Sequence, residues 1–172
     1  MIEMGAIETA SGPGHTVDVG SESPIIDATA VAVTNKPGLL AMISISTYGN
    51  GCDVASAAYG DANATEGEIY QFTIEEIHPQ SNTPYDKATA YAVADPVCVK
   101  RHVINKTYWL KGSSLTILKG AKIICAASGL VAVQTAHTAT PLPHHTWVCA
   151  KAVSAATWVQ GTYIGITSMF TA

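Results

Sequence analysis

The sequence predicts an all-β protein, a small β-barrel or β-sandwich with an extended N-terminal arm. Its apolar and alternating runs are about five or six residues long, with a turn signal about every eight to twelve residues, as in barrels and sandwiches. No amphipathic helix of about 12 residues is expected anywhere. Because 48% of the residues are hydrophobic, the chain has enough apolar side chains for a core.

The composition limits the classes of function. Only 13% of the 172 residues are charged, roughly half the usual share for a soluble domain. The surface must therefore be rich in Thr, Ser, Gly and Ala, or be covered by neighbouring molecules. A net charge of −4 and a pI near 5.8 argue against nucleic acid as a partner, since a nucleic-acid binder carries a basic face. Without an apolar run of about 18 residues or a basic leader, neither a membrane span nor a signal peptide is expected.

Residues 1–37 are expected to form the N-terminal arm. The segment 11–14 (Ser-Gly-Pro-Gly), Pro24 and Pro37 interrupt regular structure. Small side chains alternate weakly over 27–34, which suggests a strand. A segment with so few large apolar groups does not fold alone, so this strand needs a sheet edge, either of its own chain or of a neighbour.

Residues 38–105 are expected to form a β-rich region. Strands are predicted over 39–48, 68–77, 89–93 and 97–104. In the second of these, a set of apolar residues alternates with a polar set, which indicates a half-buried strand. The apolar set is Tyr70, Phe72 and Ile74, and the polar set is Gln71, Thr73 and Glu75. The residues 49–51 (Gly-Asn-Gly) are expected to turn the chain, and 54–65 to form a loop or weak helix.

Residues 106–172 have the most regular pattern and are expected to form a β domain, although 38–172 as a single domain is the alternative. Strands are predicted over 115–118, 121–126, 130–135, 147–153 and 157–166. Turns are predicted at 119–120, 128–129 and 154–156, and a loop rich in Thr, Pro and His over 136–145.

No residue is expected to be catalytic, to bind a cofactor or to hold a metal. The most metal-like group is His137, His144 and His145. Adjacent histidines point in different directions on a strand, and no acidic residue or cysteine lies between them, so polar loop residues are the preferred interpretation. Ser128 lacks the glycine spacing of a nucleophile elbow and occupies a turn position. The protein is therefore not expected to be an enzyme.

The four cysteines are expected to be reduced and structural. Cys52, Cys98, Cys125 and Cys149 are widely spaced and form no C-x-x-C motif, which excludes zinc-ribbon and thioredoxin sites. Isolated cysteines in apolar surroundings usually behave as small buried hydrophobes. One or two disulfides remain the alternative.

Four aromatic residues are the candidate interface residues: Trp109, Trp147, Trp158 and Tyr163. Aromatic side chains on alternating strands usually serve as core or interface anchors. The alternative is a platform for binding sugars.

Several segments of the C-terminal part resemble one family. They are 108–109, 115–117, 119–120, 126–133, 147–152 and 158–165. Their succession of strand, glycine turn, Gly-Leu-Val strand (129–131), variable loop and two closing strands is similar to the capsid decoration, or structural cement, proteins of tailed phages. The resemblance covers about 106–166, and residues 1–105 have no counterpart in it.

The resemblance implies a virion structural protein that stabilises a capsid. Such proteins are small β-barrels that often bind as homotrimers at quasi-threefold positions and clamp subunits of the major capsid protein. The implied location is the capsid exterior, after synthesis in the host cytoplasm. Two alternatives stay open: another virion part, such as a tail, fibre or shell subunit, or a carbohydrate-binding β-sandwich.

Overall fold

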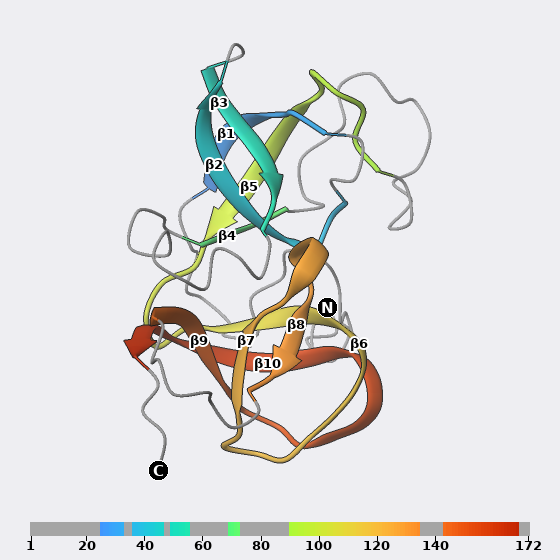
Figure 1. The fold of residues 1–172 in the computed structure, drawn as a ribbon, viewed down its shortest axis with the longest axis vertical. Helices are drawn as coiled ribbons and strands as arrows, with labels where there is room; N and C mark the ends of the chain where they lie inside the picture. Colours follow the sequence, from blue (N-terminus) through green and yellow to red (C-terminus); the bar gives the residue numbers. More distant parts are fainter. Residues whose placement is uncertain are drawn as a thin grey trace, which may run out of the picture.

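The chain folds into two closed barrels of five strands each (Figure 1). The computed structural model describes residues 25–32, 36–46, 49–55, 69–72, 90–134 and 143–168. In these ranges the regular elements are β-strands and one 3-10 turn, with irregular segments between them. The prediction of an all-β barrel protein is confirmed, and the barrels lie one above the other along the long axis of the molecule.

The first barrel contains the strands from the N-terminal half. They are β1 (Ile25–Ala30), β2 (Leu40–Ser46), β3 (Gly49–Val54), β4 (Tyr70–Phe72) and β5 (Pro96–Arg101). Their order around the barrel is β1-β3-β2-β4-β5. β1 runs parallel to β3, and the other neighbouring pairs are antiparallel.

β1 lies inside the segment that the sequence analysis assigns to the arm. It pairs with β5 from Ile25 opposite Lys100 to Thr29 opposite Pro96. The sheet edge that this strand needs is therefore supplied by its own chain. Residues 1–24 lie outside the described residues, so the arm is described only where it enters the first barrel.

The second barrel contains the C-terminal strands. They are β6 (Thr107–Ile117), β7 (Lys122–Cys125), β8 (Val131–Val133), β9 (Pro143–Cys149) and β10 (Val153–Ser168), with the 3-10 turn η3 (Ala127–Gly129) between β7 and β8. β10 pairs with both β6 and β9. Residues 102–106 connect the two barrels, at the position where the sequence analysis places its boundary.

The strand predicted over 89–93 is wrong in its described part. Residues 90–92 belong to no strand, and the chain turns at 93–94. The Ala92 N–H donates to the Asp95 carboxylate at 2.7 Å, and the Asp95 N–H donates to the Ala92 carbonyl at 3.1 Å. Because a short acidic side chain can bind nearby backbone in this way, it stabilises a turn instead of a strand.

Two predicted turns are also wrong. Residues 49–51 belong to β3, where Gly51 pairs with Ser44 of β2. Residues 154–156 lie inside β10, where a register shift against β6 marks a bulge and Ala155 has a φ of 50°. A bulge inserts residues without ending the strand, so the small residues there bend β10 around the barrel.

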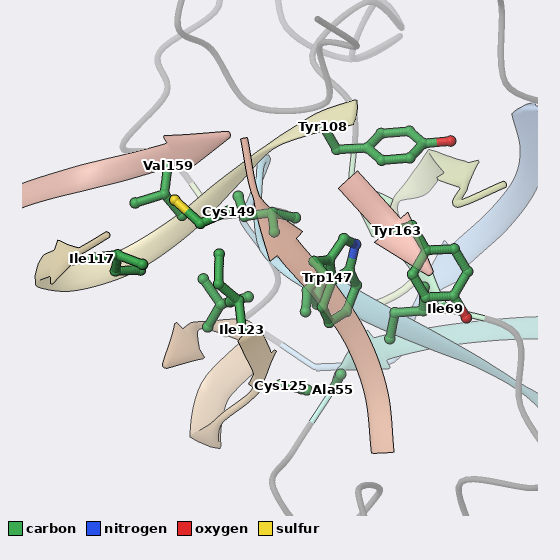
Figure 2. Close-up of a cluster of buried hydrophobic side chains, with 13 residues drawn as sticks. Ala55, Ile69, Tyr108, Ile117, Ile123, Cys125, Trp147, Cys149, Val159 and Tyr163 are labelled. Carbon is green, nitrogen blue, oxygen red and sulfur yellow. The ribbon is translucent and has the colours of Figure 1, made fainter. Parts of the chain in front are cut away.

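The core of the second barrel extends into the first barrel. Its cluster of buried side chains surrounds Trp147 and includes Leu40, Ala55 and Ile69 from the N-terminal half. Figure 2 draws Ala55 and Ile69 among the side chains of the second barrel. The backbone is joined here too, because the Gly129 N–H donates to the Ala55 carbonyl at 2.6 Å. Side chains of the N-terminal half therefore complete the core of the second barrel at the junction, while the first barrel has a separate buried cluster of its own.

All four cysteines are thiols, and three of them are buried. Burial raises the pKa of Cys52 to about 12, with a smaller contribution from Asp53, and raises the pKa of Cys125 to about 12. Thiols with such high pKa values are almost entirely protonated at neutral pH and react slowly. These two side chains are therefore packing residues.

Candidate functional site

The junction between the barrels holds the largest group of buried polar and aromatic side chains in the described part of the chain. We call it the junction cluster. Its members are Gln71, His102, Tyr108, His145, Trp147 and Tyr163. Short β4 supplies the glutamine, the connector after β5 supplies His102, and three strands of the second barrel supply the rest.

Gln71 binds both barrels through its side-chain amide. It is fully buried, although its position in the alternation predicts a polar, exposed face. Its Nε2 donates to the Gly38 carbonyl at 2.8 Å and to the Trp109 carbonyl at 2.7 Å. Both amide hydrogens are thereby used, and Oε1 lies 3.2 Å from Nε2 of His102. Oε1 must accept in that contact, so the ring nitrogen donates.

His102 is held in one neutral tautomer. The Trp147 Nε1–H donates to Nδ1 of His102 at 3.2 Å. An indole N–H can only donate, so Nδ1 carries no proton and the proton of the ring lies on Nε2, facing Gln71. The backbone N–H of His102 donates to the Ile69 carbonyl at 3.0 Å. The residue is thus fixed by partners from both barrels.

Aromatic rings surround the imidazole. The Tyr108 ring stacks on it, with centroids 3.8 Å apart and an interplanar angle of 11°, while Trp147 meets it edge-on at 5.7 Å. Burial lowers the pKa of His102 well below 6.5, and the charges of His145 and Lys100 lower it further. An apolar site disfavours the charged form of a base, so the imidazole is neutral at physiological pH.

Two of the three histidines that were considered for metal binding, His144 and His145, lie among the described residues. His144 and His145 lie on β9 and not in the predicted loop over 136–145, because β9 begins at Pro143. His145 is buried, and its Nδ1 lies 2.7 Å from the Tyr163 hydroxyl. His137 lies outside the described residues. Within the described ranges, no three His, Cys, Asp or Glu side chains gather in a way that suits a metal ion.

The structure divides the four candidate interface residues into two pairs. Trp147 and Tyr163 are buried and lie with their ring centroids 5.4 Å apart, so they belong to the core. Trp109 and Trp158 are partly exposed and lie on the neighbouring strands β6 and β10. A sugar platform that includes Trp147 is therefore excluded for this conformation.

Trp109 and Trp158 share one surface, which we call the β6–β10 outer face. It consists of three cross-strand pairs: Thr107–Thr162, Trp109–Gln160 and Lys111–Trp158. All six residues are partly exposed, and they alternate with buried residues that point into the barrel. The Lys111 ammonium lies 5.8 Å from the centroid of the Trp158 ring, a distance typical of a cation–π contact.

The geometry of the junction cluster is suited to joining the barrels. Its hydrogen bonds run from Gly38 and Trp109 through Gln71 and His102 to Trp147. A buried network whose members are satisfied fixes one packing arrangement, while a broken one is costly. Gln71 and His102 were not predicted as site residues, since no motif marks them and their partners lie far along the chain.

Among the described residues, no helix has the length and apolar character needed to cross a membrane. No family model matches the chain, and a search of curated proteins finds no match.

Proposed function

We propose that the protein is a virion structural protein of the decoration or cement type. It binds the exterior of an assembled shell and stabilises the lattice of the major capsid protein. One observation supports this most. The segment that resembles decoration proteins, about 106–166, coincides with a complete barrel, β6 to β10, whose strands span 107–168. A small barrel is the fold that the resemblance implies.

The proposed mechanism is preferential binding. A ligand that binds the assembled lattice and not the free subunit stabilises the lattice by mass action. Many copies on one shell, acting as homotrimers or other homo-oligomers, give avidity from a modest single interface. Only 13% of the residues are charged, which suits a protein whose surface is largely covered by neighbouring subunits when it functions.

We assign the contact with the major capsid protein to the β6–β10 outer face. Trp109 and Trp158 are the candidate interface residues that keep exposed surface, and Lys111 lies beside them. Tryptophan is enriched among the residues that dominate binding energy. The lysine adds a charge that can pair with an acidic group on the shell.

Replacing Trp158 with alanine is expected to weaken binding to shells. The full chain is mixed with expanded shells that are assembled from the major capsid protein of the same genome. The shells are pelleted, and the bound fraction of the chain is measured as a function of its concentration. A hot-spot tryptophan contributes about 2 kcal/mol or more, which corresponds to a Kd about 30-fold higher. The free energy of unfolding should change by only about 1 kcal/mol, since the side chain is partly exposed.

Leu118→Ala is the matched control. Leu118 is 76% exposed and follows β6, away from the outer-face pairs, so its replacement should leave pelleting unchanged. The proposed function is wrong if the wild-type chain fails to pellet with shells over the whole concentration range. If the wild type pellets and Trp158→Ala binds equally well, the surface assignment alone is wrong.

A carbohydrate-binding protein remains the second candidate, since the β6–β10 outer face combines two tryptophans with Thr and Gln side chains. Glycan-array binding that Trp158→Ala abolishes, with the fold intact, would favour it. Trp147→Ala cannot serve in this test, because Trp147 is buried. A tail or fibre part is distinguished by copy number: a handful of copies per particle in place of hundreds.

A further inference from the structure

The junction cluster has a property that shell binding does not require. Its hydrogen-bond chain has one donor for each acceptor only when the His102 ring is neutral with its proton on Nε2. Trp147 Nε1 donates to one ring nitrogen, and the other ring nitrogen donates to Gln71, whose own amide hydrogens are engaged with backbone carbonyls. The pattern leaves no acceptor for a second ring proton.

The titratable groups around the ring do not compensate for added charge. Lys100 on β5 and His145 on β9 are bases whose charge repels a protonated imidazole. Tyr108 on β6 and Tyr163 on β10 contribute phenol rings, and β4 contributes the uncharged Gln71. A cation at this position would be buried against an aromatic stack with like charges nearby, an arrangement that is strongly unfavourable.

We propose that the junction between the barrels is a pH-sensitive lock: a second proton on His102 would lie on Nδ1, opposite the Trp147 N–H, and break the chain of hydrogen bonds that joins the barrels. The lock is closed at neutral pH and weakens in mild acid. His102 contacts Gln71 and Ile69 from the N-terminal half. It also contacts Tyr108 and Trp147 of the second barrel. Adding one proton to its ring would therefore affect both barrels.

The sign of the pH dependence follows from linkage. In the unfolded chain, a histidine takes up a proton near pH 6.5, whereas the folded chain keeps His102 neutral to lower pH. Below about pH 6.5 the unfolded state therefore binds one more proton than the folded state, and stability falls as the pH falls. The unfolding equilibrium constant should rise up to about tenfold per pH unit, and it should not depend on this group above about pH 7.

The test measures the urea-unfolding constant of the full chain between pH 7.5 and 5 for the wild type, His102→Gln and Leu118→Ala. We expect the slope of this constant with pH below about pH 6.5 to be smaller in the His102 variant by about one proton, whatever the stability of that variant at pH 7. The control changes an exposed residue that carries no titratable group and should keep the wild-type dependence. If His102→Gln keeps that dependence, the proposal is overturned.

A direct measurement covers the case in which His102→Gln does not fold. The carbon-bound ring proton of His102 is followed by NMR in the wild-type chain as the pH is lowered. The proposal predicts that the folded signal keeps its neutral position until the protein unfolds. A titration near pH 6.5 with the other folded signals unchanged would overturn it. Both measurements use the isolated chain, so they do not depend on shell binding.

Discussion

Trp147→Ala is expected to lower the free energy of unfolding by about 3–5 kcal/mol, the usual cost of removing a large buried aromatic side chain. Trp147 is fully buried in the core of the second barrel, which side chains of the N-terminal half complete. Its loss leaves a cavity beside Tyr163 and removes the donor to His102 Nδ1. Urea unfolding followed by circular dichroism measures the change.

Two variants separate the causes. Trp147→Phe keeps much of the ring but removes the N–H, and an unsatisfied buried acceptor costs about 1–3 kcal/mol. Trp158→Ala removes a tryptophan that is partly exposed and should cost only about 1 kcal/mol. If Trp147→Ala were no more destabilising than Trp158→Ala, Trp147 would not be the centre of the core.

Gly129→Ala is expected to lower the free energy of unfolding by about 2–5 kcal/mol. Gly129 has a φ of 70°, and a Cβ there would lie 2.6 Å from the Leu40 carbonyl oxygen and 2.9 Å from the Leu39 Cβ. The left-handed backbone costs alanine about 1–2 kcal/mol, and overpacking adds about 1–3 kcal/mol. Because Leu39 and Leu40 belong to the first barrel, the clash would push the barrels apart.

Gly120→Ala is the matched control. Gly120 has a similar φ of 85°, but a Cβ there meets nothing within 4 Å. The control therefore has the cost of alanine at a positive φ but no steric clash. The difference in the free energy of unfolding between the two variants measures the cost of the clash between the barrels. Equal losses in both variants would mean that the barrels do not pack closely at Gly129.

Local patterns predicted the strands well. The apolar run over 121–126 is β7, and the run over 39–48 contains β2. In both cases the apolar residues of the strand come from one short stretch of sequence. The apolar pattern of that stretch is therefore enough to predict the strand. The same reasoning predicted a barrel or sandwich but did not distinguish one barrel from two.

The junction cluster could not be predicted in this way. Gln71 alternates with aromatic residues, so the pattern places it on the solvent side of a half-buried strand. It is buried because β6 of the second barrel packs against it, and the Trp109 carbonyl that it binds lies 38 residues away. Likewise, His102 binds Trp147 45 residues further along the chain. Contacts between residues so far apart in the sequence depend on how the barrels pack. A local pattern of apolar and polar residues does not indicate that packing.

Small residues that were interpreted as turn signals caused the other wrong predictions of secondary structure. Glycines at 49 and 51 and the alanines at 155 and 156 match turn signals, yet they lie in strands. Small residues also serve where a strand must bulge or where backbones approach closely. Asp95, by contrast, stabilises a turn through its own carboxylate, a role that the predicted strand over 89–93 overlooks.

The most direct test of the account is electron cryomicroscopy of expanded shells of the major capsid protein, prepared with and without this chain. We predict added density on the outer surface at symmetry-related positions, sized for two barrels, with the β6–β10 outer face toward the shell. A shell surface that stays bare in an excess of folded protein would contradict the account.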